Sequence, residues 1–323
     1  MAIDIRSMRS FVAVASAGSI SRAAEHLHIA QPALSLQIKT IEEHLGAQLF
    51  DRTSKGVTPT AAGQRFLAHA IDILKRVEVA YEDVRDAVNE PTGRVALGLS
   101  HSMAKILTIP LVSEVLRRWP KIQFQMLEMS SGYIPEYLVN GRIDLGLTFG
   151  VDEAAGLRYT HLVDEELVLV TSPSQCHSAF GKSAAKRRQV RLEELSRFPM
   201  ILPSTAHSLR NCIDDFLARH SLKLPVVAEV NAIPQLIELA ERSVGSTILS
   251  FASVAPEFAA GRIDVLRISN ERLFRPVYLC RSATAPLSIA TASVQDLIAS
   301  TAAGMIASGE WPTGFGTAAR PSL

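Results

Sequence analysis

The sequence predicts three parts: a small, mainly α-helical domain with a hairpin wing, a long helix, and an α/β domain of two lobes. Residues 19–46 have the pattern of two short helices joined by a tight turn. Residues 60–89 keep an apolar heptad pattern, and strand and helix patterns alternate after the break at residues 90–93. This alternation predicts α/β lobes with mainly parallel sheets.

The expected domain boundaries follow from these changes of pattern. We expect a small helical head domain over residues 1–59, a long linker helix over 60–90, and a two-lobed domain over 91–308. Residues 309–323 are rich in Gly, Pro, Thr and Ala, which predicts a flexible C-terminal tail.

The head is expected to hold three helices. The first covers residues 5–17 and is ended by Gly18. The second includes Arg22–Leu27, with a turn near His28 and Ile29. The third runs from Gln31-Pro32, where proline suits a first helical turn, to a stop at Gly46. It has one apolar face, made of Leu34, Ile38, Ile41 and Leu45.

The opposite side of this third helix predicts a DNA contact. Leu36 points away from the apolar face with Pro32 and Lys39 beside it, Ser35 lies between this side and the core, and Gln31 stands at the helix start. In a helix-turn-helix, such a start enters the major groove, where leucine can meet a thymine methyl. The alternative is an amphipathic helix in a small bundle, and the residues that follow favour DNA.

Residues 49–58 predict the hairpin wing, with Lys55-Gly56 near its tip. Arg52 and Lys55 can reach phosphate or the minor groove from such a wing, and the alternative is a solvated turn.

The long helix is capped by Thr60 and is expected to run to about Asn89, roughly 45 Å. A heptad pattern of this length favours pairing with a second copy of the chain over packing as a core helix. The two seams consist of Phe66, Ala70, Ile73, Val77, Ala80, Val84 and Ala87, and of Leu67, Leu74, Tyr81 and Val88.

In the two-lobed domain we expect a last strand that returns to the first lobe, and a solvated basic run at Lys182–Arg191. The expected strands are 94–100, 122–129, 144–150, 166–172, 200–202, 226–230, 247–250 and 277–281, and the expected helices are 107–119, 134–140, 209–220, 234–242 and 289–307.

Hydroxyl side chains gather where these strands end, which is where open α/β sheets bind their ligands. Serines and backbone N–H groups at helix starts suit an anion such as a carboxylate, although they also simply cap helices. The candidate effector-binding residues are Ser100, His101, Ser102, Ser130, Ser131, Thr148, Phe149, Pro203, Ser204 and Ser250.

Composition narrows the function classes. The 323 residues are 47% hydrophobic with a formal net charge of +1, so bulk charge does not indicate nucleic acid and one copy should bind DNA weakly. We expect no signal peptide, no membrane-spanning run and a cytoplasmic location. Cys176, Cys212 and Cys280 lack metal-ligand spacing, and no motif predicts a cofactor.

Residues 5–65 resemble the N-terminal domain of LysR-type transcriptional regulators. The matching segments are Met8–Val14, Gly18–Ala24, Ile29–Ser35, Ile41-Glu42, Leu45-Gly46, Gln48–Phe50, Arg52 and Thr58–Gly63. Many members have a polar or basic residue where this chain has Leu36. The resemblance implies DNA contacts from Gln31, Pro32, Ser35, Gln37 and Arg52.

The resemblance extends more weakly to the second domain, where Gly141–Leu147 fits the family. It implies a two-lobed, periplasmic-binding-protein-like effector domain and a linker helix that makes the dimer contact. The implied partners are promoter or operator DNA, a small-molecule effector, further copies in a dimer or tetramer, and RNA polymerase. It further implies an activator or repressor that is not an enzyme. Ile29–Ser35 and Gly98–Ser100 are similar to nitrogen-assimilation-control-like members.

Three alternatives remain open at this point. The chain could be a regulator controlled by its own abundance without a ligand. Gly98–Ser102 resembles a nucleophile elbow without its second glycine, which would make Ser100 the nucleophile of an α/β hydrolase. A transport solute-binding protein would share the lobes, but it would need a signal peptide and no DNA-binding head.

Overall fold

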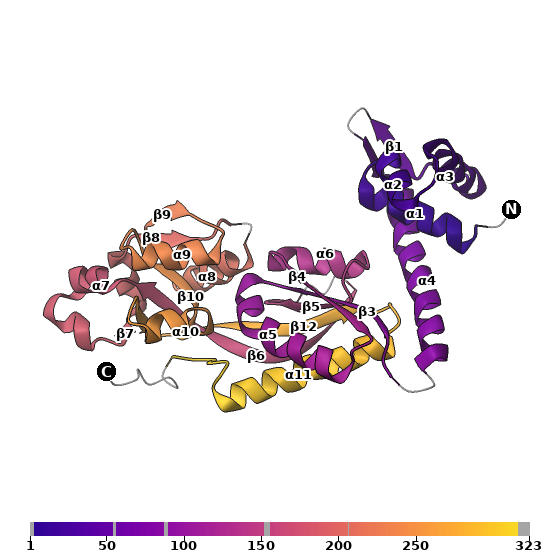
Figure 1. The fold of residues 1–323 in the computed structure, drawn as a ribbon. Helices are drawn as coiled ribbons and strands as arrows, with labels where there is room; N and C mark the ends of the chain where they lie inside the picture. Colours follow the sequence, from indigo (N-terminus) through magenta and orange to yellow (C-terminus); the bar gives the residue numbers. More distant parts are fainter. Residues whose placement is uncertain (1–2, 54–55, 87–89, 152–155, 206, 316–323) are drawn as a thin grey trace.

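The computed structural model describes residues 3–53, 56–86, 90–151, 156–205 and 207–315. Figure 1 shows the small helical domain at one end of a long helix, which stands against an elongated body of two lobes. The fold class expected from the sequence is confirmed. The N-terminal domain consists of α1 (Ile5–Ala17), α2 (Ile20–Leu27), α3 (Gln31–Leu45), β1 (Phe50–Thr53) and β2 (Gly56–Pro59).

Local capping sets the ends of these helices. The Asp4 carboxylate accepts a hydrogen bond of 2.7 Å from the Ser7 backbone N–H at the start of α1. Gly18, His28 and Gly46 end the three helices in the left-handed region, with φ of 60°, 53° and 63°. The predicted turn near His28 and the helix bounds are therefore confirmed. The buried core consists of Phe11, Val14, Ala23, Ala24, Leu34, Ile38, Ile41, Leu49, Phe50, Val57 and Ala70.

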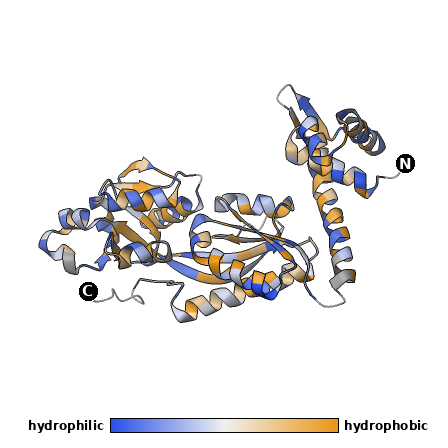
Figure 2. Ribbon diagram, viewed as in Figure 1, coloured by the Kyte–Doolittle hydropathy of each residue, from blue (hydrophilic) through white to orange (hydrophobic). Residues whose placement is uncertain are grey.

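The linker helix α4 (Ala61–Asp86) packs its first turns against this domain. A Cβ atom on Gly63 would lie 2.0 Å from the carbonyl oxygen of Leu49, so this close approach requires glycine. Figure 2 shows both hydrophobic and hydrophilic residues along α4. The predicted seam positions Ala87 and Val88, and the predicted end near Asn89, lie outside the described residues.

Two lobes follow. The first contains β3 (Gly93–Leu99), α5 (His101–Arg118), β4 (Ile122–Glu128), α6 (Ile134–Val139), β5 (Leu145–Thr148) and α11 (Ile289–Ser308). The second contains α7 (Pro173–Phe180), β7 (Gln189–Val190), β8 (Met200–Leu202), α8 (Ser208–Arg219), β9 (Val226–Glu229), α9 (Ile233–Glu241), β10 (Thr247–Ser250), α10 (Phe251–Ala259) and β11 (Asp264–Ile268). Short 3₁₀ turns cover Ser131–Tyr133, Gly181–Lys186 and Leu192–Arg197.

Two long strands, β6 (Leu157–Thr171) and β12 (Leu273–Ser282), run through both lobes as an antiparallel pair. They join the lobes into one sheet of order β4-β3-β5-β12-β6-β11-β7, and β10 also pairs with β6. β3 is parallel to β4 and β5, but β5, β10 and β11 run antiparallel to the long strands. The expectation of mainly parallel sheets is therefore wrong along β6 and β12.

The expected return of the last strand to the first lobe is confirmed by the pairing of β12 with β5. Both crossing strands are longer than the sequence pattern indicated. The first half of β6 is partly exposed and polar, and the start of β12 contains Pro276 and the charged Arg275. Helices α7 and α10 and strands β7 and β11 were not expected from the pattern. Each lobe has its own core, and Figure 2 shows the hydrophobic residues concentrated in the strands of both.

The C-terminal segment corrects the expectation of a flexible tail. After Gly309 ends α11, Trp311 is fully buried in the first-lobe core and Phe315 is buried in the second. Gly, Pro and Thr between them let the chain follow the surface of β6, where the backbone N–H of Glu166 donates to the Thr313 carbonyl at 2.8 Å. Residues 316–323 lie outside the described residues.

The helix α11 corrects a second expectation. By length and composition it is apolar enough to cross a membrane, contrary to the expectation that no run would be. It packs on the first lobe through Ala290, Val294, Leu297, Ile298 and Ala302, which is what a core helix of a folded domain does.

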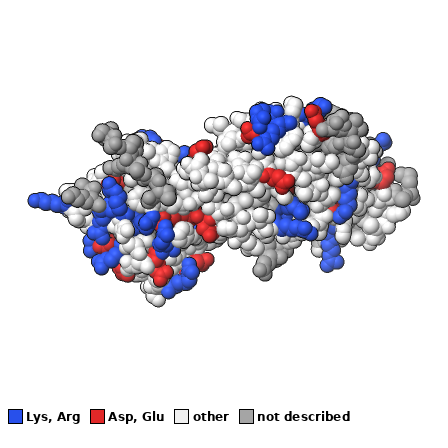
Figure 3. Space-filling model, turned by 90° about the horizontal axis from the view of Figure 1, so that it is seen from below, with Lys and Arg blue, Asp and Glu red and all other residues white. Residues whose placement is uncertain are grey.

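Figure 3 shows a largely uncharged surface along the middle of the molecule and mixed charges over the second lobe.

Candidate DNA interface and effector cleft

The start of α3 presents an open, accessible face. Gln31, Pro32 and Lys39 are exposed, Ser35 is half-buried, and the side of α3 that carries Leu34, Ile38 and Ile41 is buried. Leu36 is 65% exposed, as the helical geometry predicted. Leu36 therefore lies outside the buried core of the domain and is accessible from outside.

Gln37 differs from the other candidates on α3. Its side-chain oxygen accepts a hydrogen bond of 2.7 Å from the hydroxyl of Ser10, which is buried in α1. The residue lies one helical turn from Leu34 and Ile41 and therefore faces the bundle. As a direct DNA contact, Gln37 is the weakest of the predicted residues, and its position indicates that it braces α3 on α1.

The wing places Arg52 beside the third helix. Its guanidinium lies 3.8 Å from the Glu42 carboxylate, and its side chain is about half exposed. The other oxygen of Glu42 accepts hydrogen bonds from the backbone N–H groups of Leu49 (2.8 Å) and Phe50 (3.2 Å). Glu42 thus fixes the base of the hairpin, and Arg52 stays accessible from outside. The other wing candidate, Lys55, lies outside the described residues.

One face of α4 rests on the first lobe. The Lys75 ammonium pairs with the Asp144 carboxylate at 2.8 Å, and Arg76 donates to the Thr284 carbonyl at 3.1 Å. Gly141, with φ of 61°, leaves room for Ile71, whose Cγ2 would lie 2.6 Å from a Cβ atom there. The opposite face is open: Tyr81 and Val84 are 70% and 77% exposed. These are seam positions, so the later part of the apolar seam is open in the protomer, whereas the earlier seam position Ala70 is buried in the core of the N-terminal domain.

A cleft of about 680 Å³ lies between the lobes, and it brings together most of the predicted effector residues. Its lining includes Ser100, His101, Ser102, Ser130, Ser131, Phe149 and Ser204. Thr148, Pro203 and Ser250, also predicted, do not line it. Each is buried. Thr148 lies within β5, and the Pro203 carbonyl accepts a hydrogen bond from Arg210. Ser250 is the residue before α10, and its hydroxyl lies 2.6 Å from that of Ser253.

The hydroxyl groups of the cleft already interact with one another. Ser100 and Ser102 are 3.2 Å apart between their Oγ atoms. The Ser131 hydroxyl lies 2.6 Å from that of Ser208, which links the first lobe to the start of α8 in the second. His101 contacts the Glu128 carboxylate at 2.7 Å and not the Ser100 hydroxyl, which leaves Ser100 without a catalytic base among the described residues. The nucleophile interpretation of Ser100 therefore has no geometric support in the part of the chain that the structure describes.

The residues predicted for the cleft did not include Arg275 on β12. It is a buried arginine that lines the cleft. It is 3% exposed, its guanidinium carbon lies 3.5 Å from the centre of the Phe149 ring, and its Nη2 donates to Glu165 at 2.6 Å. Its Nε is buried without a hydrogen-bond acceptor among the described residues. The signal was present in the sequence: Leu273, Val277 and Leu279 alternate, and this alternation puts Arg275 on their buried face.

His207 lies at the second-lobe side of the cleft, where its Nδ1 accepts the Leu209 backbone N–H at 3.2 Å and caps α8. Burial, and secondarily the charge of Arg275, lower its pKa below the ordinary 6.5. Because the folded pKa is depressed, the unfolded chain takes up a proton first as the pH falls. Stability from this group is therefore complete above pH 6.5 and is lost below it.

We expect His207→Asn to reduce this acid sensitivity, since asparagine keeps a capping oxygen and does not titrate. Urea unfolding at about pH 7.5 and about pH 5.5 measures the difference for wild type and variant. Equal losses of stability in both proteins would show that His207 does not contribute.

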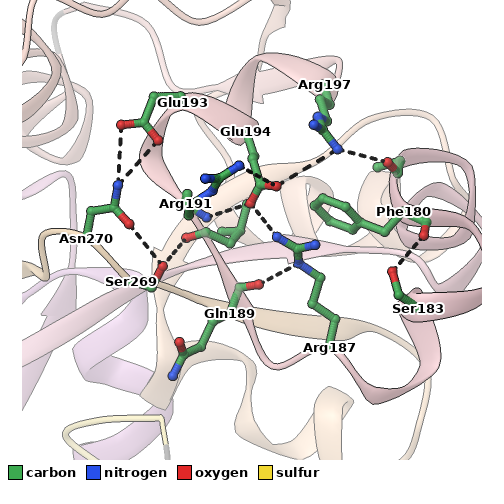
Figure 4. A network of polar contacts seen from close by, with 12 residues as sticks. Phe180, Ser183, Arg187, Gln189, Arg191, Glu193, Glu194, Arg197, Ser269 and Asn270 are labelled. Atoms are coloured by element: carbon green, nitrogen blue, oxygen red, sulfur yellow. Dashed lines mark hydrogen bonds and ion pairs between the residues drawn. The ribbon is translucent and has the colours of Figure 1, made fainter.

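The basic run predicted to be solvated is only partly so. In Figure 4, Arg187, Arg191 and Arg197 surround the buried carboxylate of Glu194, and Arg187 also stacks 3.7 Å from the Phe180 ring centre. Burial alone would raise the pKa of Glu194, but the Arg191 backbone N–H and the Arg187 guanidinium hold it below its ordinary value. Among the described side chains of the run, Lys182, Arg188 and Arg191 are exposed, and Arg187 is half-buried.

The three cysteines are free thiols. Burial raises the pKa of Cys280 to about 12 and also raises the pKa of Cys176 and Cys212. Each is therefore a neutral thiol at physiological pH, which disfavours oxidation chemistry through thiolates.

Comparison with known proteins gives concordant results. Residues 5–64 match the family described as "Bacterial regulatory helix-turn-helix protein, lysR family", and residues 89–303 match "LysR substrate binding domain". The chain is 29% identical over 299 residues to the nitrogen assimilation regulatory protein nac of Escherichia coli, covering 92% of this chain and 95% of that one. It is 27% identical over 310 residues to the regulator BbuR of Bordetella bronchiseptica, covering 96% and 93%. The fold is similar to that of a full-length OxyR variant from Pseudomonas aeruginosa, with a TM-score of 0.72, 21% identity, and coverage of 92% and 98%.

Proposed function

The chain belongs to the LysR family of transcriptional regulators. We propose that it recognises its operator through α3 and the wing, and that a small anion bound in the inter-lobe cleft regulates its activity. It is a DNA-binding regulator and not an enzyme. The residues assigned below, the oligomer and the effector class are parts of this proposal.

The DNA contacts are assigned to Gln31, Pro32, Ser35, Leu36, Lys39 and Arg52. The observation that supports them is the shared open face at the start of α3, with Arg52 beside it on the wing. Polar side chains at such a helix start can bond base edges, and Leu36 can pack on a thymine methyl. Arg52 suits phosphate, which would set position on the duplex without reading sequence.

A net charge of +1 supplies little attraction for DNA, so we infer that several heads act together. The open apolar face of α4 supports pairing of linker helices into dimers, and two dimers can form a tetramer. We place the regulator in the cytoplasm with promoter DNA, where RNA polymerase is the partner through which it would activate transcription.

The effector class follows from the polar groups of the cleft. Arg275 supplies a cation with one unpartnered N–H, and the hydroxyls of Ser100, Ser102 and Ser131 supply neutral donors nearby. A buried N–H without an acceptor costs about 1–3 kcal/mol, which a bound carboxylate would recover. Because the lining comes from both lobes, a ligand that prefers one lobe arrangement would shift the protein toward it. The linker helix, fixed to the first lobe at Asp144, would pass that shift to the head.

A thermal-shift screen of metabolite anions on wild type, Ser100→Ala and Ser102→Ala tests this assignment. Losing one hydroxyl to a charged ligand should weaken binding by about tenfold and leave operator binding without ligand unchanged. Ser196→Ala, on an exposed turn outside the cleft, is the matched control. Hits that stabilise all four proteins equally would place the site elsewhere. No hit, together with regulation that follows protein level alone, would favour the ligand-independent alternative.

A further inference from the structure

The segment Trp311–Phe315 connects the two lobes a third time, beside β6 and β12. Trp311 is packed in the core of the first lobe, and Phe315 lies in the second, with ring centres 5.3 Å from Phe251 and 5.4 Å from Phe258. At the second-lobe end, the Phe315 backbone N–H also donates to the Glu166 carboxylate at 2.7 Å. Figure 1 shows this segment leaving α11 and passing along β6 toward the second lobe.

The same segment is connected to the cleft through one carboxylate. Glu165 is 1% exposed, and its two oxygens have different partners: Oε1 accepts the Trp311 indole N–H at 3.0 Å, and Oε2 accepts Arg275 Nη2 at 2.6 Å. Glu165 and Arg275 are directly opposite each other in the β6–β12 pair. Trp311 therefore competes with a second guanidinium N–H for Oε1, the oxygen that a two-bond pair with Arg275 would need.

This division of the carboxylate matters for Arg275. A guanidinium and a carboxylate bind most strongly through two parallel hydrogen bonds. In this structure the pair has one, and Arg275 keeps its stacking on Phe149 at the cleft wall. If both Glu165 oxygens were available, the two-bond pair would satisfy more of the guanidinium internally and leave less of its charge and fewer of its donors for an anion.

We propose that Trp311 is a positioning residue for the effector site: by holding one oxygen of Glu165, it keeps Arg275 available to an anion in the cleft. This inference rests on the proposed function and assigns a binding role to a segment whose sequence reads as a loose tail. The segment does not line the cleft, so it would not contact the bound anion and would act on it only through Glu165.

The test uses full-length protein and four named probes, acetate, succinate, citrate and phosphate, titrated at constant ionic strength. The variants are Trp311→Phe, which keeps an aromatic ring but removes the N–H, Glu165→Gln, and the two combined. Wild type is expected to bind at least one probe, and Trp311→Phe to bind it about tenfold more weakly, the value of one charge-assisted hydrogen bond. In the Glu165→Gln background, Trp311→Phe should change the affinity less than about twofold, because the carboxylate through which Trp311 acts on Arg275 has been removed.

A purely packing role predicts a different pattern. Trp311→Phe would then weaken binding of the probe equally in both backgrounds, or would lower the melting temperature without changing the affinity. Either result overturns the proposal.

Fluorescence gives a second readout. In a Trp119→Phe protein, Trp311 is the remaining tryptophan, and the bound probe should change its emission. An emission unchanged at saturating probe also contradicts the coupling.

One further variant separates this inference from the proposed function. Glu165→Gln combined with Arg275→Gln replaces the buried ion pair by two neutral amides, so no uncompensated charge is left inside. If it binds the probes as wild type does, or if wild type binds none of them, the anion site itself is wrong. If it loses binding while Trp311→Phe keeps wild-type affinity, the anion site is supported and only the proposed role of Trp311 is contradicted.

Discussion

Val84→Asp is expected to dissociate the oligomer and abolish operator binding without disturbing the fold of the protomer. Val84 is 77% exposed in the protomer, so aspartate there remains hydrated and costs the fold little. In a paired linker helix the same carboxylate would lie in a desolvated seam, where an unpaired charge costs several kcal/mol. Operator binding should be lost with the pairing, because one head carries too few cationic contacts to hold DNA alone.

Light scattering for mass and a gel shift for operator binding measure both effects on the same samples. Ile73→Asp, on the same face of α4, should behave alike, and Ile73→Leu should remain wild type because it keeps an apolar side chain. A Val84→Asp protein with the wild-type mass would mean that α4 does not make the contact.

The second large effect is expected at the start of α3. Gln31→Ala and Ser35→Ala should each cost about 1–3 kcal/mol at the cognate operator and much less on unrelated DNA, because they remove base-edge contacts. Arg52→Ala should instead weaken binding to all sequences and lower the salt dependence by about one counterion. This difference separates residues that read sequence from a residue that positions the protein.

Fluorescence anisotropy with operator and random duplexes over a series of salt concentrations distinguishes the two classes. Lys182→Ala, which removes an exposed cation in the second lobe, is the matched control and should change neither quantity. Unchanged operator affinity in all three head variants would remove α3 and the wing from the interface.

Elements that depend on neighbouring residues were predictable from the sequence. The bounds of α1 and α3, the turn at His28 and the strand β8 follow from helical period, caps and short apolar runs, which act within a few residues. The hydroxyls of the cleft were predictable for the same reason, because a strand followed by a helix start places Ser100 and Ser131 at the same edge of the sheet.

The features that were missed depend on contacts far apart in sequence. Arg275 looks like a surface residue of a strand, and only its pairing with Glu165, 110 positions away, makes its burial tolerable. Trp311 lies among residues typical of loops, and its burial depends on a first-lobe core and on the same Glu165. The hydrogen bond from the Ser10 hydroxyl to Gln37, which joins two helices, is likewise not visible in the sequence pattern, and a DNA contact from Gln37 stays a prediction of the family resemblance.

The central claim is that this chain reads a specific DNA sequence through the start of α3. Sequencing the DNA recovered with the full-length protein from its own cells tests it most directly, with the Gln31→Ala/Ser35→Ala double variant beside wild type. We predict that wild-type fragments share one motif with dyad symmetry, since paired heads read paired half-sites, and that the variant recovers few of them. Fragments without a common sequence, or the same motif recovered equally by the variant, would contradict the claim.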